Sequence, residues 1–135
     1  MARELESITE SEWRVMEVLW RDGPQLMAQI VASLEEETKW SRTTVLTLAG
    51  RLEKKGYIGT ERSSRAYTYI PLVRRKEARR AELERFVNQI YAGDSYQLVR
   101  QLTDIGAISR DDLKRLGERL ESGGKSRRKN RKKNG

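Results

Sequence analysis

The sequence predicts a mainly α-helical protein with a small β-hairpin. This combination belongs to the α+β class. Three observations carry this prediction. Apolar residues recur at helical spacing over residues 13–52 and again over residues 74–120. Between these stretches, residues 57–72 change to the two-residue alternation typical of strands. Sequences that cap helix N-termini stand in front of several apolar stripes.

The first helix is predicted to begin after Thr9, because Thr9 and Glu12 form a T-x-x-E capping box. Its apolar stripe is formed by Trp13, Met16, Leu19 and Trp20. Residues 22–24, Asp-Gly-Pro, end the helix. Tryptophans on such a stripe are expected to pack in the core rather than to stack on single-stranded nucleic acid.

Two further helices follow. Apolar positions predict the second helix, at Leu26, Ile30, Val31 and Leu34. Ser41 is the candidate N-cap of the third helix. The core-facing residues of the third helix are Val45, Leu48, Ala49 and Leu52. Gly56 predicts its end, because glycine suits the turn after a helix and the preceding Lys54 and Lys55 complement the helix dipole.

A hairpin comes next, with strands at residues 57–62 and 65–72, Ser63 and Ser64 at the turn, and Pro71 at the end of the second strand. Three short helices followed by a two-stranded ribbon form the winged helix-turn-helix arrangement, in which the hairpin is the β-wing. We expect this domain to span residues 1–73.

The helical period returns after residue 74, and Ser109 with Asp112 forms a second capping sequence. Three short helices cannot bury a substantial core alone, so we expect a dimerisation domain at residues 74–122. Its predicted interface residues are Leu83, Phe86, Ile90, Leu98, Leu102, Leu113, Leu116 and Leu120. Residues 123–135 are expected to form a disordered basic tail.

Composition excludes several classes of chemistry. The 135 residues include no cysteine and no histidine. Disulfides, thiolate nucleophiles, the usual zinc sites and histidine acid–base catalysis are therefore excluded. We expect no enzymatic activity, no cofactor and no metal. No apolar run is long enough to span a membrane, and the N-terminus lacks the apolar stretch of a secretory signal, so a cytoplasmic protein is expected.

The net charge of +8 is unevenly distributed. Residues 1–38 hold nine acidic and three basic residues, whereas residues 39–65 hold two acidic and seven basic ones. Residues 123–135 add seven basic residues and no acidic one. A clustered basic face is typical of a protein that binds a polyanion, although a solvated charged surface is the alternative.

The third helix has a polar face opposite its apolar one. A recognition helix presents its first turns to the major groove, where arginine reads guanine and a threonine methyl group packs on thymine. Hydroxyl groups near its N-terminus can hold phosphates, and the tip of the β-wing would lie along the DNA backbone or minor groove. The predicted DNA-binding residues are Ser41, Arg42, Thr43, Thr44, Thr47, Arg51, Lys54 and Lys55 of the helix, with Arg62, Ser63, Ser64 and Arg65 of the tip.

These segments resemble a known family. The likeness lies in residues 8–16 with Trp20, residues 40–58 (Trp-Ser-Arg-Thr-Thr-Val-Leu-Thr-Leu through Lys-Lys-Gly-Tyr-Ile), residues 67–73, and residues 86–93 with Leu98 and Val99. Over roughly residues 8–121 the chain resembles the penicillinase-repressor family (BlaI/MecI/CopY type) of winged-helix repressors. The resemblance implies a homodimeric transcriptional repressor on a double-stranded, inverted-repeat operator. It aligns Thr44, Thr47 and Arg51 with the family's recognition-helix residues.

The resemblance also implies a signalling partner. In antibiotic-responsive members a membrane sensor-protease signals, and the repressor is cut at an Asn-Phe bond in a C-terminal helix. The matching bond here is Gln101-Leu102. The copper-responsive branch needs a C-x-C cluster, which this chain lacks. Arg42, Leu46 and Gly50 depart from the family pattern, so a different operator preference is expected.

The basic tail supports a second hypothesis. Seven cations in residues 123–135 would bind nucleic acid of any sequence, since phosphate contacts carry no sequence information. The alternative function is therefore a nonspecific nucleic-acid-binding protein driven by this tail.

Overall fold

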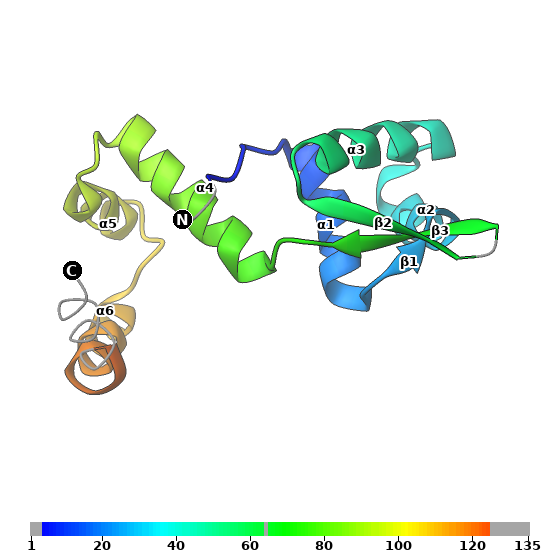
Figure 1. The fold of residues 1–135 in the computed structure, drawn as a ribbon. Helices are drawn as coiled ribbons and strands as arrows, with labels where there is room; N and C mark the ends of the chain where they lie inside the picture. Colours follow the sequence, from blue (N-terminus) through cyan, green and yellow to red (C-terminus); the bar gives the residue numbers. More distant parts are fainter. Residues whose placement is uncertain (1–3, 64, 125–135) are drawn as a thin grey trace. The chain divides into compact units, whose positions relative to one another are not determined.

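The computed structural model describes residues 4–63 and 65–124 (Figure 1). The elements, in chain order, are α1 (Glu10–Asp22), β1 (Gln25–Leu26), α2 (Met27–Thr38), α3 (Arg42–Lys54), β2 (Ile58–Ser63), β3 (Ala66–Pro71), α4 (Arg75–Ile90), α5 (Ser95–Asp104), α6 (Arg110–Arg119) and a π-helical turn over Leu120–Gly124. The predicted class, mainly α with a small β-wing, is confirmed.

The chain divides into two compact units, Met1–Arg85 and Phe86–Gly135. The division falls inside α4, later than the predicted boundary after residue 73. The reason is that Ala78, on the first half of α4, is fully buried in the core of the first unit. The division of function between residues 1–73 and 74–122 stays a prediction. Of the predicted tail, residues 125–135 lie outside the described residues.

Local sequence signals fix the first helix. The Thr9 side chain accepts a hydrogen bond from the Glu12 N–H, and the Glu12 carboxylate accepts one from the Thr9 N–H. Both bonds satisfy donors that a helix N-terminus leaves without partners. Gly23 ends α1 at a φ of 80°, a conformation that favours glycine. The predicted capping box and stop are confirmed.

The core of the first unit lies between α1, α2, α3 and the start of β2. Its buried apolar residues are Ile8, Val15, Met16, Val18, Leu19, Met27, Ile30, Leu34, Val45, Leu48, Ala49, Leu52, Tyr57, Ile58, Val73 and Ala78. All four residues predicted for the inner face of the third helix are among them. Trp13 and Trp20 pack against this core, as expected, and Trp40 does so as well.

The sheet has three antiparallel strands in the order β1-β3-β2, one more strand than the hairpin predicted. The added strand, β1, is two residues long and pairs Gln25 with Tyr69. Leu26 was predicted on the apolar face of the second helix, and this was wrong. It is the N-cap of α2 and remains 40% exposed, because its backbone belongs to the sheet edge.

The second unit contains the end of α4, α5 and α6. The Asp94 carboxylate accepts from the Gln97 N–H at the start of α5. The Ser109 hydroxyl accepts from the Asp112 N–H at the start of α6, and the Asp112 carboxylate accepts from the Ser109 N–H. The predicted capping sequence at Ser109 is therefore confirmed. No residue of α5 or α6 is buried, which leaves their apolar faces without a cover in the described chain.

Residues 4–63 and 65–124 contain neither a helix that could span a membrane nor a cluster of side chains that could hold a metal ion. None of their helices is long and apolar enough to cross a membrane. No group of three or more acidic residues within them is placed to hold a metal ion.

Candidate nucleic-acid interface

Helix α3 carries the first part of the candidate interface. Ser41 starts the helix, because its hydroxyl accepts a hydrogen bond from the Thr44 N–H at 3.2 Å. Core packing of the apolar face then fixes which residues point outward. The exposed residues of the predicted set on this element are Ser41, Arg42, Thr43, Thr44, Thr47, Arg51 and Lys54.

The cations of this surface lack acidic partners. Within the part of the chain that the structure describes, ion pairs occupy Arg14, Arg21, Lys55, Arg75, Arg80, Arg85 and Arg115. None involves Arg42, Arg51 or Lys54 of α3, nor Arg62 or Arg65 of the hairpin. Exposed cations that gather on one surface create a positive potential, which attracts a polyanion.

The hydroxyl groups of α3 are engaged with the helix itself. The Thr47 hydroxyl donates to the Thr43 carbonyl at 3.0 Å. The hydroxyls of Ser41 and Thr44 lie 3.2 Å apart. In Thr47 this bond satisfies the polar group locally, which leaves the methyl group for apolar contact. A threonine methyl group is the type of surface that packs on the methyl group of thymine.

Lys55 differs from the other predicted DNA-binding residues. Its ammonium lies 2.8 Å from a carboxylate oxygen of Glu12 and 2.9 Å from the Ser7 carbonyl oxygen. The Glu12 side chain is 1% exposed and the Lys55 side chain 22%. The structure therefore places Lys55 against the N-terminus of α1, and its predicted contact with DNA stays untested.

Burial and hydrogen bonding shift the pKa of Glu12 in opposite directions. Burial disfavours its charged form, but hydrogen bonds from Lys55 and from the Thr9 N–H favour it, and the positive charges of Lys55 and Arg51 add to them. The net effect lowers the pKa of Glu12 below its ordinary value. Glu12 thus stays ionised and holds Lys55 at the C-terminal end of α3.

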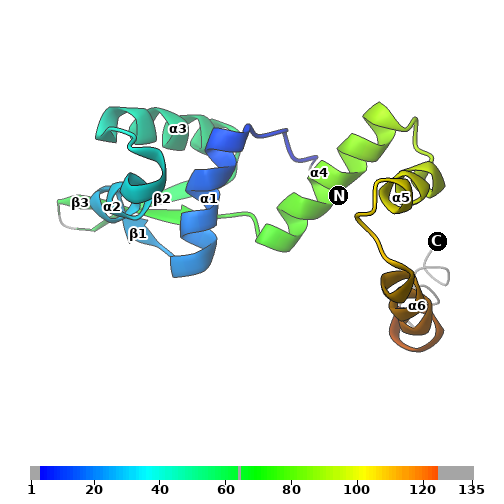
Figure 2. The same cartoon turned by 180° about the vertical axis from the view of Figure 1, so that it is seen from behind.

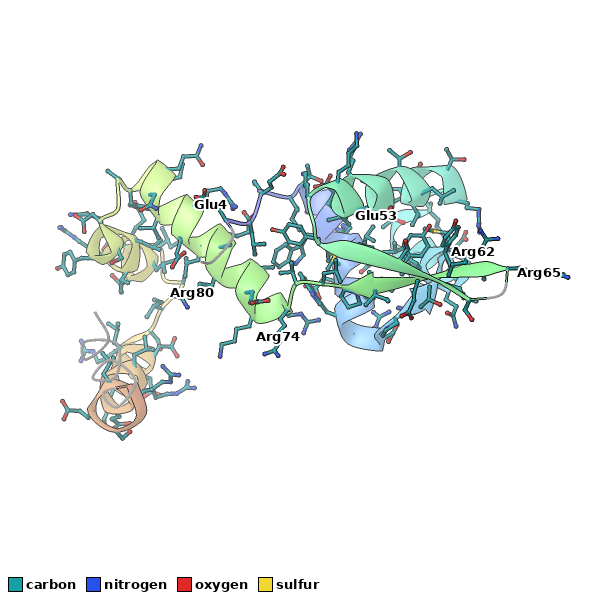
Figure 3. All side chains as sticks on the ribbon, in the orientation of Figure 1. Glu4, Glu53, Arg62, Arg65, Arg74 and Arg80 are labelled. Atoms are coloured by element: carbon teal, nitrogen blue, oxygen red, sulfur yellow. The ribbon has the colours of Figure 1, made fainter. Side chains whose placement is uncertain are left out.

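The hairpin β2–β3, here called the wing, supplies the second part of the interface. The Arg62 guanidinium lies 5.5 Å from the centroid of the Tyr67 ring, which is half exposed. Arg65 projects from the tip, away from the rest of its unit (Figure 3). Ser63 is exposed, whereas Ser64 lies outside the described residues. The tip therefore presents two arginines, one of them steadied by an aromatic ring.

The two parts lie at the same end of the first unit. Figures 1 and 2 show the N-terminal end of α3 and the ends of β2 and β3 nearest the tip at one extremity of this unit. A surface that combines a helix with exposed first turns and a basic ribbon tip suits the groove and backbone of a duplex.

Sequence reasoning missed the contact of Glu12 with Lys55 and that of Tyr67 with Arg62. Glu12 was assigned only to the capping box, and its second partner lies 43 residues away in the sequence. Tyr67 was assigned only to the second strand of the hairpin. An arginine that stands opposite a tyrosine in a predicted hairpin is a usable signal for the Tyr67 contact, since Arg62 and Tyr67 are register partners.

The predicted dimerisation residues are incompletely covered. The exposed ones are Leu83, Phe86, Ile90, Leu113, Leu116 and Leu120, whereas Leu98 and Leu102 are half-buried. Leu83 belongs to the first unit and the others to the second. Exposed large apolar residues on consecutive helices are typical of an interface. The matching cleavage bond, Gln101–Leu102, lies within α5.

Comparison with known proteins agrees with these features. A family model described as penicillinase repressor matches residues 8–122. The methicillin resistance regulatory protein MecI of Mammaliicoccus sciuri is 28% identical over 109 residues, which cover 81% of this chain and 89% of MecI. The penicillinase repressor of Bacillus licheniformis is 25% identical over 131 residues, which cover 97% of this chain and 98% of that repressor.

A solved structure is similar to the winged-helix part. It is the solution structure of the monomeric form of Bacillus licheniformis BlaI in complex with the blaP half-operator. The match has a TM-score of 0.50 and 25% sequence identity, and it covers 56% of this chain and 93% of that one.

Proposed function

Because the chain belongs to the penicillinase-repressor family, we propose that it is a DNA-binding transcriptional repressor that binds an inverted-repeat operator as a homodimer. The similar BlaI structure holds a half-operator, which supports a duplex as the ligand. A two-fold symmetric dimer matches a two-fold symmetric site, with one half-site for each protomer.

One observation carries the proposal. Exposed cations lie on both α3 and the wing, and none of them forms an ion pair among the described residues: Arg42, Arg51, Lys54, Arg62 and Arg65. The arrangement leaves these charges available for phosphates and for the edges of bases.

Individual roles follow from position on the surface. Thr44, Thr47 and Arg51 are proposed to reach base edges from α3, with Arg51 as the candidate for guanine. Backbone contacts are proposed for Ser41, Arg42, Thr43, Lys54, Arg62, Ser63, Ser64 and Arg65. Lys55 is proposed to act from within the fold, because its ammonium is already bound by Glu12 and by the Ser7 carbonyl.

Regulation by a membrane sensor-protease stays a prediction. The bond Gln101–Leu102 lies in a helix, and a protease that binds an extended chain would have to unwind α5 locally to cut it. Mass spectrometry of the protein from induced cells tests this prediction. An N-terminal fragment ending at Gln101 would support it, and an intact chain throughout induction would contradict it.

Selection of bound duplexes from a random pool tests the main proposal against tail-driven binding. The full chain and a chain truncated after Ser122 are compared. An enriched palindrome with both proteins supports a dimeric repressor. Binding that needs the tail, without sequence enrichment, supports the alternative. In that case the tail should also steepen the salt dependence by about 0.9 for each phosphate contact.

Variants of α3 test the assignment of the recognition helix. Thr47→Ala and Arg51→Ala should each weaken discrimination between the enriched duplex and random DNA by about 1–3 kcal/mol, because a base contact is lost. Fluorescence anisotropy titrations measure both affinities. Ser33→Ala, which changes an exposed residue of α2, is the control. Unchanged discrimination in both α3 variants would contradict the assignment.

A further inference from the structure

A large apolar side chain, Leu46, is exposed on α3. The other large apolar residues of this helix, Val45, Leu48 and Leu52, are all buried in the core of the first unit. Leu46 is 40% exposed, and the helix completes its apolar face without it. Single exposed leucines are common on protein surfaces, so exposure alone assigns no role. The surroundings of Leu46 on the candidate interface assign one.

The neighbours of Leu46 on the helix surface leave it open and place it beside a cation. Residues three and four positions away share its side of the helix, and among them are Arg42, Thr43 and Gly50. Gly50 has no side chain, and a Cβ atom added there would have no atom within 4 Å. Arg42 is exposed and forms no ion pair among the described residues. The isobutyl group of Leu46 is therefore accessible within a part of the surface that attracts a polyanion.

Leu46 also lies on the side of α3 that faces the wing. Glu53 stands on the same side of the helix, because positions i and i+7 nearly coincide around a helix axis. The Thr60 hydroxyl of β2 donates to the Glu53 carboxylate at 3.4 Å, which places this side of α3 toward the wing. A duplex that contacts both α3 and the wing would therefore cover Leu46.

Burial of this side chain against DNA favours one chemical group as its partner. An isobutyl group neither donates nor accepts a hydrogen bond, so it cannot replace the water that it displaces from a phosphate or from a polar base edge. In the major groove only thymine presents an apolar group, its C5-methyl. Contact between two apolar groups removes both of them from water. Leu46 therefore favours a T·A pair at the position that it meets.

We propose that Leu46 is a specificity-determining residue that packs against the C5-methyl group of one thymine in each half-site. The inference rests on the proposed function, since it requires α3 to lie in the major groove. Leu46 differs in kind from Arg51, whose proposed contact with guanine depends on hydrogen bonds. The contribution of Leu46 arises from desolvation, so loss of a single methyl group from the DNA removes it.

The test removes that methyl group without changing any base pair. Deoxyuridine pairs with adenine as thymidine does but lacks the C5-methyl group. Each thymine of the palindrome selected from the random pool is replaced in turn, at symmetric positions of both half-sites. Anisotropy titrations of each full-length protein then give the ratio of its affinities for the thymine and deoxyuridine duplexes, here called the methyl penalty.

The variants change the size and the polarity of the side chain separately. Leu46→Ala shortens it. Leu46→Met and Leu46→Gln are a matched pair, because both new side chains are unbranched and of similar length but only methionine is apolar. Leu26→Ala is the control, since Leu26 is also 40% exposed but lies at the start of α2. Alanine, methionine and glutamine all favour helices, so α3 should stay folded in the three Leu46 variants.

The wild-type protein should show a methyl penalty of about 15-fold at one thymine of each half-site, which is about fourfold for each methyl group removed. At the same thymine, Leu46→Ala and Leu46→Gln should show a penalty of about twofold or less, because the partner of the methyl group is gone. Leu46→Met should keep most of the wild-type penalty, and Leu26→Ala should keep all of it.

Three outcomes would overturn the inference alone. One is a palindrome in which no thymine shows a methyl penalty with the wild-type protein. Another is a wild-type penalty that persists in Leu46→Ala, because a different residue would then contact the methyl group. The third is an equal penalty in Leu46→Met and Leu46→Gln, because the polarity of the side chain would then be irrelevant. Failure to enrich any duplex would instead overturn the proposed function, and this inference with it.

Discussion

At the scale of single residues, Glu12 has two structural roles. It caps α1 through the Thr9 N–H and holds the ammonium of Lys55 at the end of α3. A carboxylate that is 1% exposed requires such partners, because burial of an unpaired charge is costly. The pairing joins the start of α1 to the C-terminal end of α3.

The lowered pKa of Glu12 predicts how stability depends on pH. The folded protein binds this proton less tightly than the unfolded chain, whose ordinary value is 4.5. The contribution of Glu12 is therefore present above pH 4.5 and is lost as the pH falls below it, through the folded pKa. Urea unfolding across this range should show a steeper loss in the wild type than in Glu12→Gln. Equal slopes in the two proteins would contradict the prediction.

The same variant should be less stable at neutral pH. Glu12→Gln should lower the free energy of unfolding by about 1.5–3 kcal/mol, because a charge-assisted hydrogen bond to Lys55 is lost. Glu10→Gln is the control, since Glu10 is an exposed residue in the same first turn. A similar loss in both variants would mean that only the helix dipole is affected.

Substitution of Gly50 should raise, rather than lower, the free energy of unfolding. Gly50 lies in the interior of α3, and a Cβ atom added there would have no atom within 4 Å. Alanine favours a helix interior over glycine by about 1 kcal/mol. Gly50→Ala should therefore raise the free energy of unfolding by about that amount in urea titrations. A destabilised variant would show that the backbone at this position is strained.

At the scale of secondary-structure elements, helix caps decide where α3 begins. Ser41→Ala should destabilise the protein by about 1 kcal/mol, because the Thr44 N–H loses its acceptor. Ser41→Asp should retain the cap, since aspartate is an equally good N-cap residue. The added negative charge should nevertheless weaken DNA binding. Thermal unfolding and anisotropy titrations of both variants separate the two effects, and equal DNA affinity in Ser41→Asp would place this turn away from phosphates.

The same elements show how far the sequence determines the fold. The starts of α1, α3 and α6 were predicted because Thr9, Ser41 and Ser109 find their partners three residues away. Strand β1 was not predicted, since its pairing with Tyr69 depends on residues far along the chain. The outward face of α3 was predicted from periodicity. The engagement of Lys55 with Glu12 was not, because 43 residues separate the two.

At the scale of the whole molecule, the exposed apolar residues of the second unit predict an interface. Leu116→Asp should shift the protein toward monomer in sedimentation velocity, because a charge would be buried between the chains. Operator affinity should fall by about 100-fold as simultaneous binding is lost. Lys114→Asp, an exposed change on the same helix, is the control. An intact dimer in Leu116→Asp would place the interface elsewhere.

The junction between α1 and α4 gives the molecule a spectroscopic reporter of its own. Trp13 and Trp20 meet edge to face, with ring centroids 5.1 Å apart. The Trp20 indole N–H donates to the Val73 carbonyl, just before α4. Two indoles at this distance couple their electronic transitions, so their circular dichroism and emission depend on the geometry of this contact. A movement of the start of α4 is therefore visible in the unlabelled protein.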